Sequence, residues 1–289
     1  MKPMRPIRLI SAWLGLVACT WTLSAQDLTD VTVDSENTAP GYTMYRPKDL
    51  DAATAQGRLP VLVFGNGGCS RTSLGYMKML GAIASEGYLV LAVGSVEPDR
   101  PSGGQNLPYS ELGKEDFLVD ALDWVCRVSA DEKSIYYHKV DVSHIALAGH
   151  SCGGAQAMRA SYDPRVTTTV MMNSGMGTMT MANASPADLD ELHAPILYLI
   201  GGPEDVAYPN ANLDFEHIRT VPAVCANYPV GHNATYGEEK GGIFGEMLLR
   251  WLDWQLKGNV AASVFFLDSA WRDKYYPGWD VKTKNTDKL

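Results

Sequence analysis

Short apolar runs recur along the chain and predict the strands of a buried sheet. Their apolar residues follow one another almost without interruption, which is typical of strands covered on both faces. The six runs occupy residues 59–64, 88–93, 145–148, 167–172, 196–200 and 221–228. We therefore expect at least six strands, none of them with one face in water.

Two segments between these runs carry apolar residues at helical spacing. They are residues 116–128, with Phe117, Ala121, Leu122, Val125 and Val128, and residues 243–256, with Ile243, Met247, Trp251 and Trp254. Alternating strands and helices predict an α/β fold with a mostly parallel central sheet and helices on both faces. No internal repeat, linker or shift in composition is visible, so residues 26–289 are expected to form a single domain. Residues 100–108 are the clearest surface loop.

The first 25 residues are expected to be a signal peptide for export. Three positive charges are followed by an apolar run over residues 9–18, which is too short to span a bilayer. Simple cleavage after Ala25 is the favoured interpretation. The alternative is a lipoprotein signal in which Cys19 carries the lipid. Either route predicts a secreted or periplasmic protein, free or anchored at a surface by that lipid, and no later apolar run is long enough for a transmembrane segment.

The composition and charge of the chain limit the kinds of molecule that it is expected to bind. The 289 residues are 46% hydrophobic and 20% charged, as in ordinary globular proteins, and the formal charge is −9. A chain without basic clusters lacks the electrostatic footprint of a nucleic-acid binder, so no nucleic acid partner is expected. Metal-binding motifs such as C-x-x-C and H-E-x-x-H do not occur. We therefore expect neither a metal nor a cofactor.

The sequence Gly149-His150-Ser151-Cys152-Gly153 is a G-x-S-x-G motif between a predicted strand and a helical segment. In this setting a sharp turn lifts the serine hydroxyl clear of the backbone, and only small residues two positions before and after it fit. Ser151 meets this requirement as a nucleophile. Cys152 does not, because His150 would occupy the small position. The alternative is a glycine-rich turn without catalytic chemistry.

A serine nucleophile needs a base, and the base needs an acid that holds it in one tautomer. Asp205, with Glu204 as the alternative, follows the run 196–200, at the carboxyl end where parallel sheets place their ligand sites. His232 follows the run 221–228 and is the expected base. The remaining histidines are His138, His144 and His193 before predicted strands, His217 on a helical segment, and His150 inside the motif.

Two backbone amides are expected to form an oxyanion hole. The first is the amide of Cys152, at the start of a helix whose dipole favours negative charge. The second is expected from the glycine-rich segment 65–69, with Cys69 as the first choice and Gly68 as the second. The alternative for this segment is a tight turn that requires a positive φ, and the two interpretations are compatible.

Taken together, these motifs resemble the α/β-hydrolase superfamily, especially secreted esterases of the cutinase-like, dienelactone-hydrolase-like and acetylhydrolase-like branches. The resemblance covers residues 42–258. It implies an α/β-hydrolase catalytic domain over residues 26–289 and a carboxylic ester hydrolase with an acyl-enzyme on Ser151. Two departures matter: residues 176–192 are too few for the helical lid of true lipases, and the C-terminal disulfide pattern of cutinases is absent. No large lid and an open cleft are therefore expected.

The chain contains five cysteines, four of them outside the signal segment, and export permits disulfides. Cys69 and Cys152 are both expected beside the oxyanion hole, so we predict that they form a disulfide there. The alternative is a pair of free thiols. Cys126 and Cys225 are assigned to a helix and a distant strand, and we expect both to be buried thiols.

The sequence thus predicts a serine carboxylesterase with Ser151, Asp205 and His232 as its catalytic triad. The expected substrates are short-chain, aromatic or polymer-attached esters, such as acetyl, feruloyl or polyester groups. A serine peptidase or acyltransferase of the same fold is one alternative, because a triad alone does not select among these reactions. A non-catalytic, glycan-binding surface lipoprotein is the other.

Overall fold

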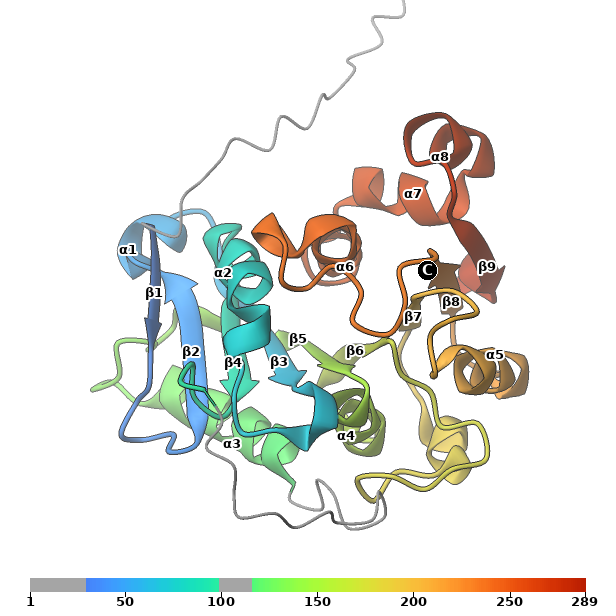
Figure 1. The fold of residues 1–289 in the computed structure, drawn as a ribbon. Coiled ribbons are helices and arrows are strands. Elements are labelled where there is room, and N and C mark those ends of the chain that lie inside the picture. The colour runs from blue at the N-terminus through green and yellow to red at the C-terminus, as the bar shows by residue number, and fades with distance from the viewer. Residues whose placement is uncertain (1–29, 99–115) are drawn as a thin grey trace, which may run out of the picture.

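The computed structural model describes residues 30–98 and 116–289 (Figure 1). The expected signal peptide, the lipidation site at Cys19 and the loop at residues 100–108 lie outside these residues. No helix in the described ranges is long and apolar enough to cross a membrane.

A nine-stranded sheet runs through the described part of the chain, in the order β1-β2-β4-β3-β5-β6-β7-β8-β9. The six central strands, β3 to β8, pair with one another in parallel. β1 pairs antiparallel with β2, β2 with β4, and β9 with β8. The strands are β1 Val31–Asp34, β2 Tyr42–Pro47, β3 Leu59–Gly65, β4 Leu89–Val93, β5 Val140–His150, β6 Val166–Met172, β7 Ile196–Ile200, β8 Ala223–Asn227 and β9 Asp280–Lys284. The expected mostly parallel α/β sheet is confirmed.

Each of the six predicted runs corresponds to one strand from β3 to β8. The prediction for β5 was too short, because this strand already begins at Val140 and includes His144. Three strands escaped prediction altogether. β1 and β9 are the two edges of the sheet, and β9 reads Asp-Val-Lys-Thr-Lys with little burial, so its sequence carries no apolar run.

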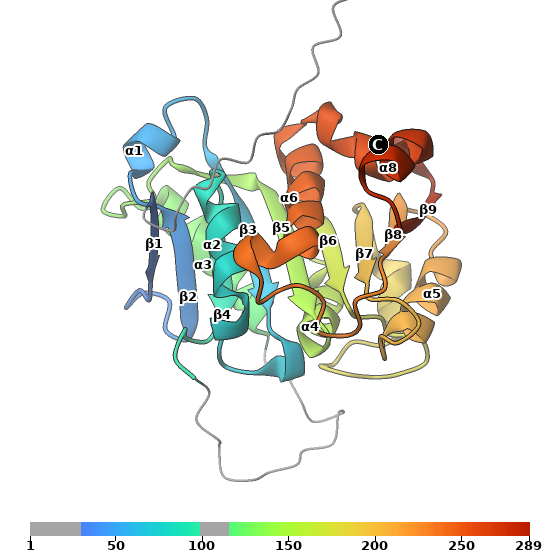
Figure 2. The same ribbon diagram turned by 45° about the horizontal axis from the view of Figure 1, so that its top comes forward.

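Helices cover both faces of the sheet (Figures 1 and 2). Side chains of α2 and α6 pack in one buried cluster, and those of α3, α4 and α5 pack in clusters on the opposite face. The α-helices are α1 Leu50–Ala53, α2 Met77–Ser85, α3 Phe117–Ala130, α4 Cys152–Ala160, α5 Tyr208–His217, α6 Gly242–Lys257, α7 Val264–Leu267 and α8 Ser269–Tyr275. The two predicted helical segments correspond to α3 and α6.

The strands separate two cores by alternating their side chains. In β3, Leu62 and Phe64 join the cluster under α2 and α6, whereas Val61 and Val63 join the cluster under α3. Adjacent residues of a strand point to opposite faces, so an uninterrupted apolar run fills both cores at once. Because the strands from β3 to β8 all run parallel, their carboxyl ends lie at one edge of the sheet.

The segment between β6 and β7 contains one short 3₁₀ helix, η5 (Pro186–Glu191), and no α-helix. All its residues belong to the described part of the chain. This agrees with the expectation that residues 176–192 form no lipase-type helical lid.

Candidate active site

Ser151 occupies a strained turn between β5 and α4. Its φ of 52° and ψ of −115° place a non-glycine residue at positive φ, which costs free energy and persists only where the surroundings enforce it. The Ser151 amide donates to the carbonyl oxygen of Met172 in β6 (3.0 Å). The turn therefore fixes the serine at the carboxyl end of the sheet.

The glycines of the motif allow three backbone segments to meet below the turn. A Cβ atom on Gly149 would lie 2.1 Å from the carbonyl oxygen of Gly153. A Cβ atom on Gly153 would lie 2.1 Å from the carbonyl group of Gly65 at the end of β3. The need for small residues on either side of Ser151 thus comes from close backbone contact among β3, β5 and α4.

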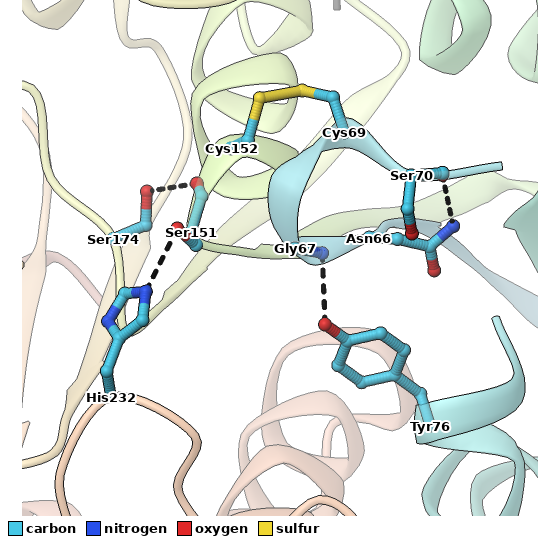
Figure 3. The surroundings of a disulfide bond; sticks show 9 residues. All are labelled: Asn66, Gly67, Cys69, Ser70, Tyr76, Ser151, Cys152, Ser174 and His232. Carbon is cyan, nitrogen blue, oxygen red and sulfur yellow. Dashed lines mark hydrogen bonds between the residues drawn. A yellow bond between two sulfur atoms is a disulfide. The ribbon is translucent and has the colours of Figure 1, made fainter. Parts of the chain in front are cut away.

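The structure brings Ser151, His232 and Asp205 together. The Oγ atom of Ser151 lies 3.1 Å from Nε2 of His232, and Nδ1 of His232 lies 2.6 Å from Oδ1 of Asp205. Because a carboxylate accepts, the Nδ1 proton points to Asp205 and Nε2 is left to accept the serine proton. The three side chains follow β5, β8 and β7, and Figure 3 shows His232 pointing at Ser151.

The Asp205 carboxylate is fully buried, and several donors stabilise its charge. Oδ2 accepts from Nδ2 of Asn173 (2.7 Å) and the Gly201 amide (3.0 Å), while Oδ1 also accepts from the Ala207 amide (2.9 Å). Burial tends to raise the pKa of Asp205, but the hydrogen bonds from His232 and these donors outweigh it and lower the pKa below its ordinary value. Asp205 therefore stays ionised.

Asp205 contacts His232, whereas the alternative acid, Glu204, is exposed to solvent. Sequence reasoning missed Asn173, which follows β6 and ties Asp205 to the backbone carbonyl of Gly231 (3.1 Å), next to His232. The hydroxyl of Tyr236 donates to the Oδ1 atom of Asn173. One feature of the sequence could have identified Asn173: it follows directly after a predicted strand, at the carboxyl end.

Cys69 and Cys152 form the expected disulfide, with their Cα atoms 5.2 Å apart. The bond joins η2 (Gly67–Cys69), in the loop after β3, to the first residue of α4 (Figure 3). Gly68 and Cys69 both have positive φ, 64° and 48°. The covalent bond thus holds a strained loop against the start of the helix that carries Ser151.

The two candidates for the second oxyanion donor differ in the structure. The amide of Cys69 already donates to the carbonyl oxygen of Asn66 (3.1 Å), which makes the first choice less suitable than Gly68. The amide of Cys152 lies in the first turn of α4, where backbone N–H groups have no partner within the helix.

Cys126 and Cys225 are free thiols. Cys225 is buried as expected, and burial raises the pKa of its thiol to about 12. The expectation of burial was wrong for Cys126, which is only half-buried; it lies on α3 between the exposed residues Asp123 and Arg127, and its sulfur lies 3.9 Å from Nη1 of Arg165. Within residues 30–98 and 116–289, no group of three or more His, Cys, Asp or Glu side chains is arranged to hold a metal ion.

The strand order, the strained turn after β5 and the placement of the other two side chains after β7 and β8 define the α/β-hydrolase fold. A comparison of sequences points the same way. Over 148 residues, 50% of this chain, the protein is 28% identical to the α/β hydrolase xenA of Xenoacremonium sinensis. The match covers 32% of that protein, so this chain aligns with about a third of its relative. No family model matches the chain.

We expect Gly153→Ala to destabilise the fold, because the added methyl group would lie 2.1 Å from the Gly65 carbonyl. Overpacking of this kind costs about 1–3 kcal/mol. Urea unfolding of the variant and of Gly57→Ala, whose methyl group would meet no atom within 4 Å, measures the difference. Equal stability of the two variants would contradict the close packing of the turn.

Asp205 should make stability depend on pH. Because its pKa is lowered in the folded protein, it contributes stability above the ordinary carboxyl pKa, and this contribution is lost as the pH falls through the lowered value. We therefore expect the free energy of unfolding to fall more steeply for the wild type than for Asp205→Asn between about pH 5 and pH 3. Urea titrations at several pH values measure both slopes, with Asn in place of the exposed Asp51 as the control. If the unfolding free energies of the wild type and Asp205→Asn changed with pH in parallel, the lowered pKa of Asp205 in the folded protein would be contradicted.

Proposed function

We propose that the protein is an exported serine carboxylesterase in which Ser151, His232 and Asp205 form the catalytic triad. The observation that carries the proposal is the continuous contact from Asp205 through His232 to the Oγ atom of Ser151. The strained turn at Ser151 adds to it, because such a turn exposes a nucleophile at the edge of a sheet. The similarity to an α/β hydrolase is consistent with hydrolysis.

In the proposed reaction, Oγ of Ser151 attacks the ester carbonyl carbon while its proton moves to Nε2 of His232. The carbonyl oxygen becomes an oxyanion, and the tetrahedral intermediate collapses when His232 returns the proton to the departing alkoxide. An acyl-Ser151 ester and an alcohol result. Water then attacks the acyl group, His232 takes its proton, and the collapse releases the carboxylic acid and restores Ser151. Asp205 stabilises the imidazolium in both halves.

The oxyanion is proposed to be held by the amides of Cys152 and Gly68. Fixed donors of this kind contribute roughly 3 kcal/mol each to transition-state stabilisation. The amide of Cys152 has the further advantage of the helix dipole at the start of α4. The disulfide at Cys152 joins this helix to the loop that contains Gly68, so it would keep the two donors at a constant separation.

The proposed substrates are short-chain, aromatic or polymer-attached esters. The segment between β6 and β7 contributes no α-helix that would cover a long acyl chain. Val206, next to the buried Asp205, exposes 74% of its surface and offers an apolar contact at this edge of the sheet. Export is supported by the disulfide, because such bonds persist in oxidising compartments, and by the charged and apolar N-terminal segment.

Hydrolysis should depend on Ser151 and favour esters over amides. We expect the wild type to cleave p-nitrophenyl acetate and butyrate faster than the octanoate, and an aminoacyl nitroanilide hardly at all. Ser151→Ala should lower kcat by about 10⁴-fold or more, because triad residues act as a unit. Initial rates measure this, and Ser161→Ala at the other end of α4 is the control. Preference for the amide would favour a peptidase, and undiminished activity of Ser151→Ala would contradict the assignment.

Loss of the disulfide should lower both stability and turnover. The bond closes a sequence separation of 83 residues, for which the entropic stabilisation is about 4.5 kcal/mol. In Cys69→Ser, we expect the free energy of unfolding to fall and kcat to fall more than KM changes, because the loop carrying Gly68 loses its tether. Cys126→Ser, which removes a free thiol, is the control. An unchanged kcat in a destabilised Cys69→Ser would limit the disulfide to a structural role.

A further inference from the structure

His150, the residue immediately before Ser151, is buried and has a partner at each ring nitrogen. Its Nδ1 lies 2.7 Å from the hydroxyl oxygen of Tyr76, and its Nε2 lies 2.9 Å from the backbone carbonyl oxygen of His232. The Tyr76 hydroxyl also lies 3.0 Å from the backbone nitrogen of Gly67 in the loop after β3 (Figure 3). A chain of three contacts thus runs from the Gly67 loop to the His232 loop.

The chemistry of the partners fixes the direction of each hydrogen bond. A carbonyl oxygen only accepts, so Nε2 of His150 carries a proton and donates it to the backbone of His232. Burial lowers the pKa of His150 to about 4, so the ring is neutral at physiological pH and its Nδ1 accepts. Burial also raises the pKa of Tyr76 to about 12, so its hydroxyl keeps the proton that it donates to Nδ1. The tyrosine oxygen then accepts from the Gly67 amide.

We propose that His150 and Tyr76 are positioning residues that hold the backbone of His232 at the distance from Ser151 that proton transfer requires. The proposal rests on the proposed function, because it gives His232 the role of base. His150 shares the strained turn with Ser151, so a hydrogen bond from His150 to the His232 backbone links nucleophile and base by a second route. The first route is the direct contact between their side chains.

The loop around His232 depends on such anchors because it has no regular structure. Gly231 and Ala234 both have positive φ, 77° and 44°. Two successive carbonyl groups in this loop accept hydrogen bonds from side chains at the sheet edge: Asn173 donates to Gly231 and His150 donates to His232. Loss of the second bond would leave the loop anchored at Gly231, by Asn173 and by the hydrogen bond from the Gly231 amide to the Gly201 carbonyl (2.7 Å), and would free the backbone at His232 itself, so that its ring can tilt away from Ser151.

Close packing keeps the chain of contacts in place. A Cβ atom on Gly67 would lie 2.4 Å from Nδ1 of His150 and 2.8 Å from the hydroxyl oxygen of Tyr76, so glycine is needed for their approach. The ring of Tyr236 packs 5.0 Å from His150 and 5.5 Å from Tyr76, measured between centroids. The same tyrosine donates to Asn173, so the two anchors of the His232 loop contact one residue.

Two substitutions at His150 separate its two hydrogen bonds. Asparagine places its Oδ1 near the position of Nδ1, so His150→Asn keeps an acceptor for Tyr76 and loses the donor to His232. Glutamine places its amide nitrogen near the position of Nε2, so His150→Gln keeps the donor. We expect kcat for p-nitrophenyl acetate to fall about ten- to a hundredfold in His150→Asn, with KM changed less than about threefold, and to recover in part in His150→Gln. The kcat of Tyr76→Phe should lie between those of the two His150 variants.

Tyr136→Phe is the control, because Tyr136 is a buried tyrosine of another core cluster and its hydroxyl donates to the Glu36 carboxylate (2.6 Å). Tyr136→Phe should have a lower free energy of unfolding than the wild type and an unchanged kcat. A second readout is the proton NMR signal of Nδ1–H in His232, which should shift or broaden in His150→Asn and not in Tyr136→Phe. Unchanged kcat and signal in His150→Asn, or equal losses in the asparagine and glutamine variants, would overturn the positioning role. A wild type no faster than Ser151→Ala would instead defeat the proposed function, while the NMR signal would still test the contact.

Discussion

The close backbone contact between Gly153 and the Gly65 carbonyl at the end of β3 is the constraint on which the site depends. Glycine at this position allows α4 to begin directly against the end of β3, and Ser151 joins β5 to this helix at a φ of 52°. A wider turn would leave the serine hydroxyl on the sheet surface and separate Cys69 from Cys152, whose Cα atoms are 5.2 Å apart. One steric requirement thus sets the serine, the start of the helix and the disulfide together.

The second condition for the site is the buried negative charge of Asp205. The polar groups around this carboxylate stabilise it. An isolated carboxylate inside a protein is strongly destabilising, but Asp205 accepts hydrogen bonds from a side-chain amide, two backbone amides and His232. The donors come from the segments after β6, β7 and β8, so the parallel sheet itself brings them to the charge. The same groups fix the loops: Asn173 reaches Gly231, and His150 reaches the His232 backbone.

Much of the fold could be predicted because the central strands are apolar on both faces, and the candidate triad because its members follow such strands at one edge. Prediction failed where the strand contains no uninterrupted apolar run, as in β2, which reads Tyr-Thr-Met-Tyr-Arg-Pro although most of it is buried. The edge strand Asp280–Lys284 is polar and exposed, and β5 continues through polar residues before Ile145. The contacts of Tyr76 and Asn173 join residues far apart in sequence through single hydrogen bonds, which no spacing rule encodes. The partial exposure of Cys126 likewise depends on which side of α3 faces solvent, a tertiary detail that its position on a predicted helix does not give.

If His232 and Asp205 activate the hydroxyl of Ser151, this residue should react selectively with a phosphonylating reagent that targets activated serines. The folded protein is incubated with a fluorophosphonate, and the modified residue is identified by intact mass followed by peptide mass spectrometry. We expect one phosphonyl group per chain, attached to Ser151. A protein that remains unmodified, or that is modified at another residue, would contradict it.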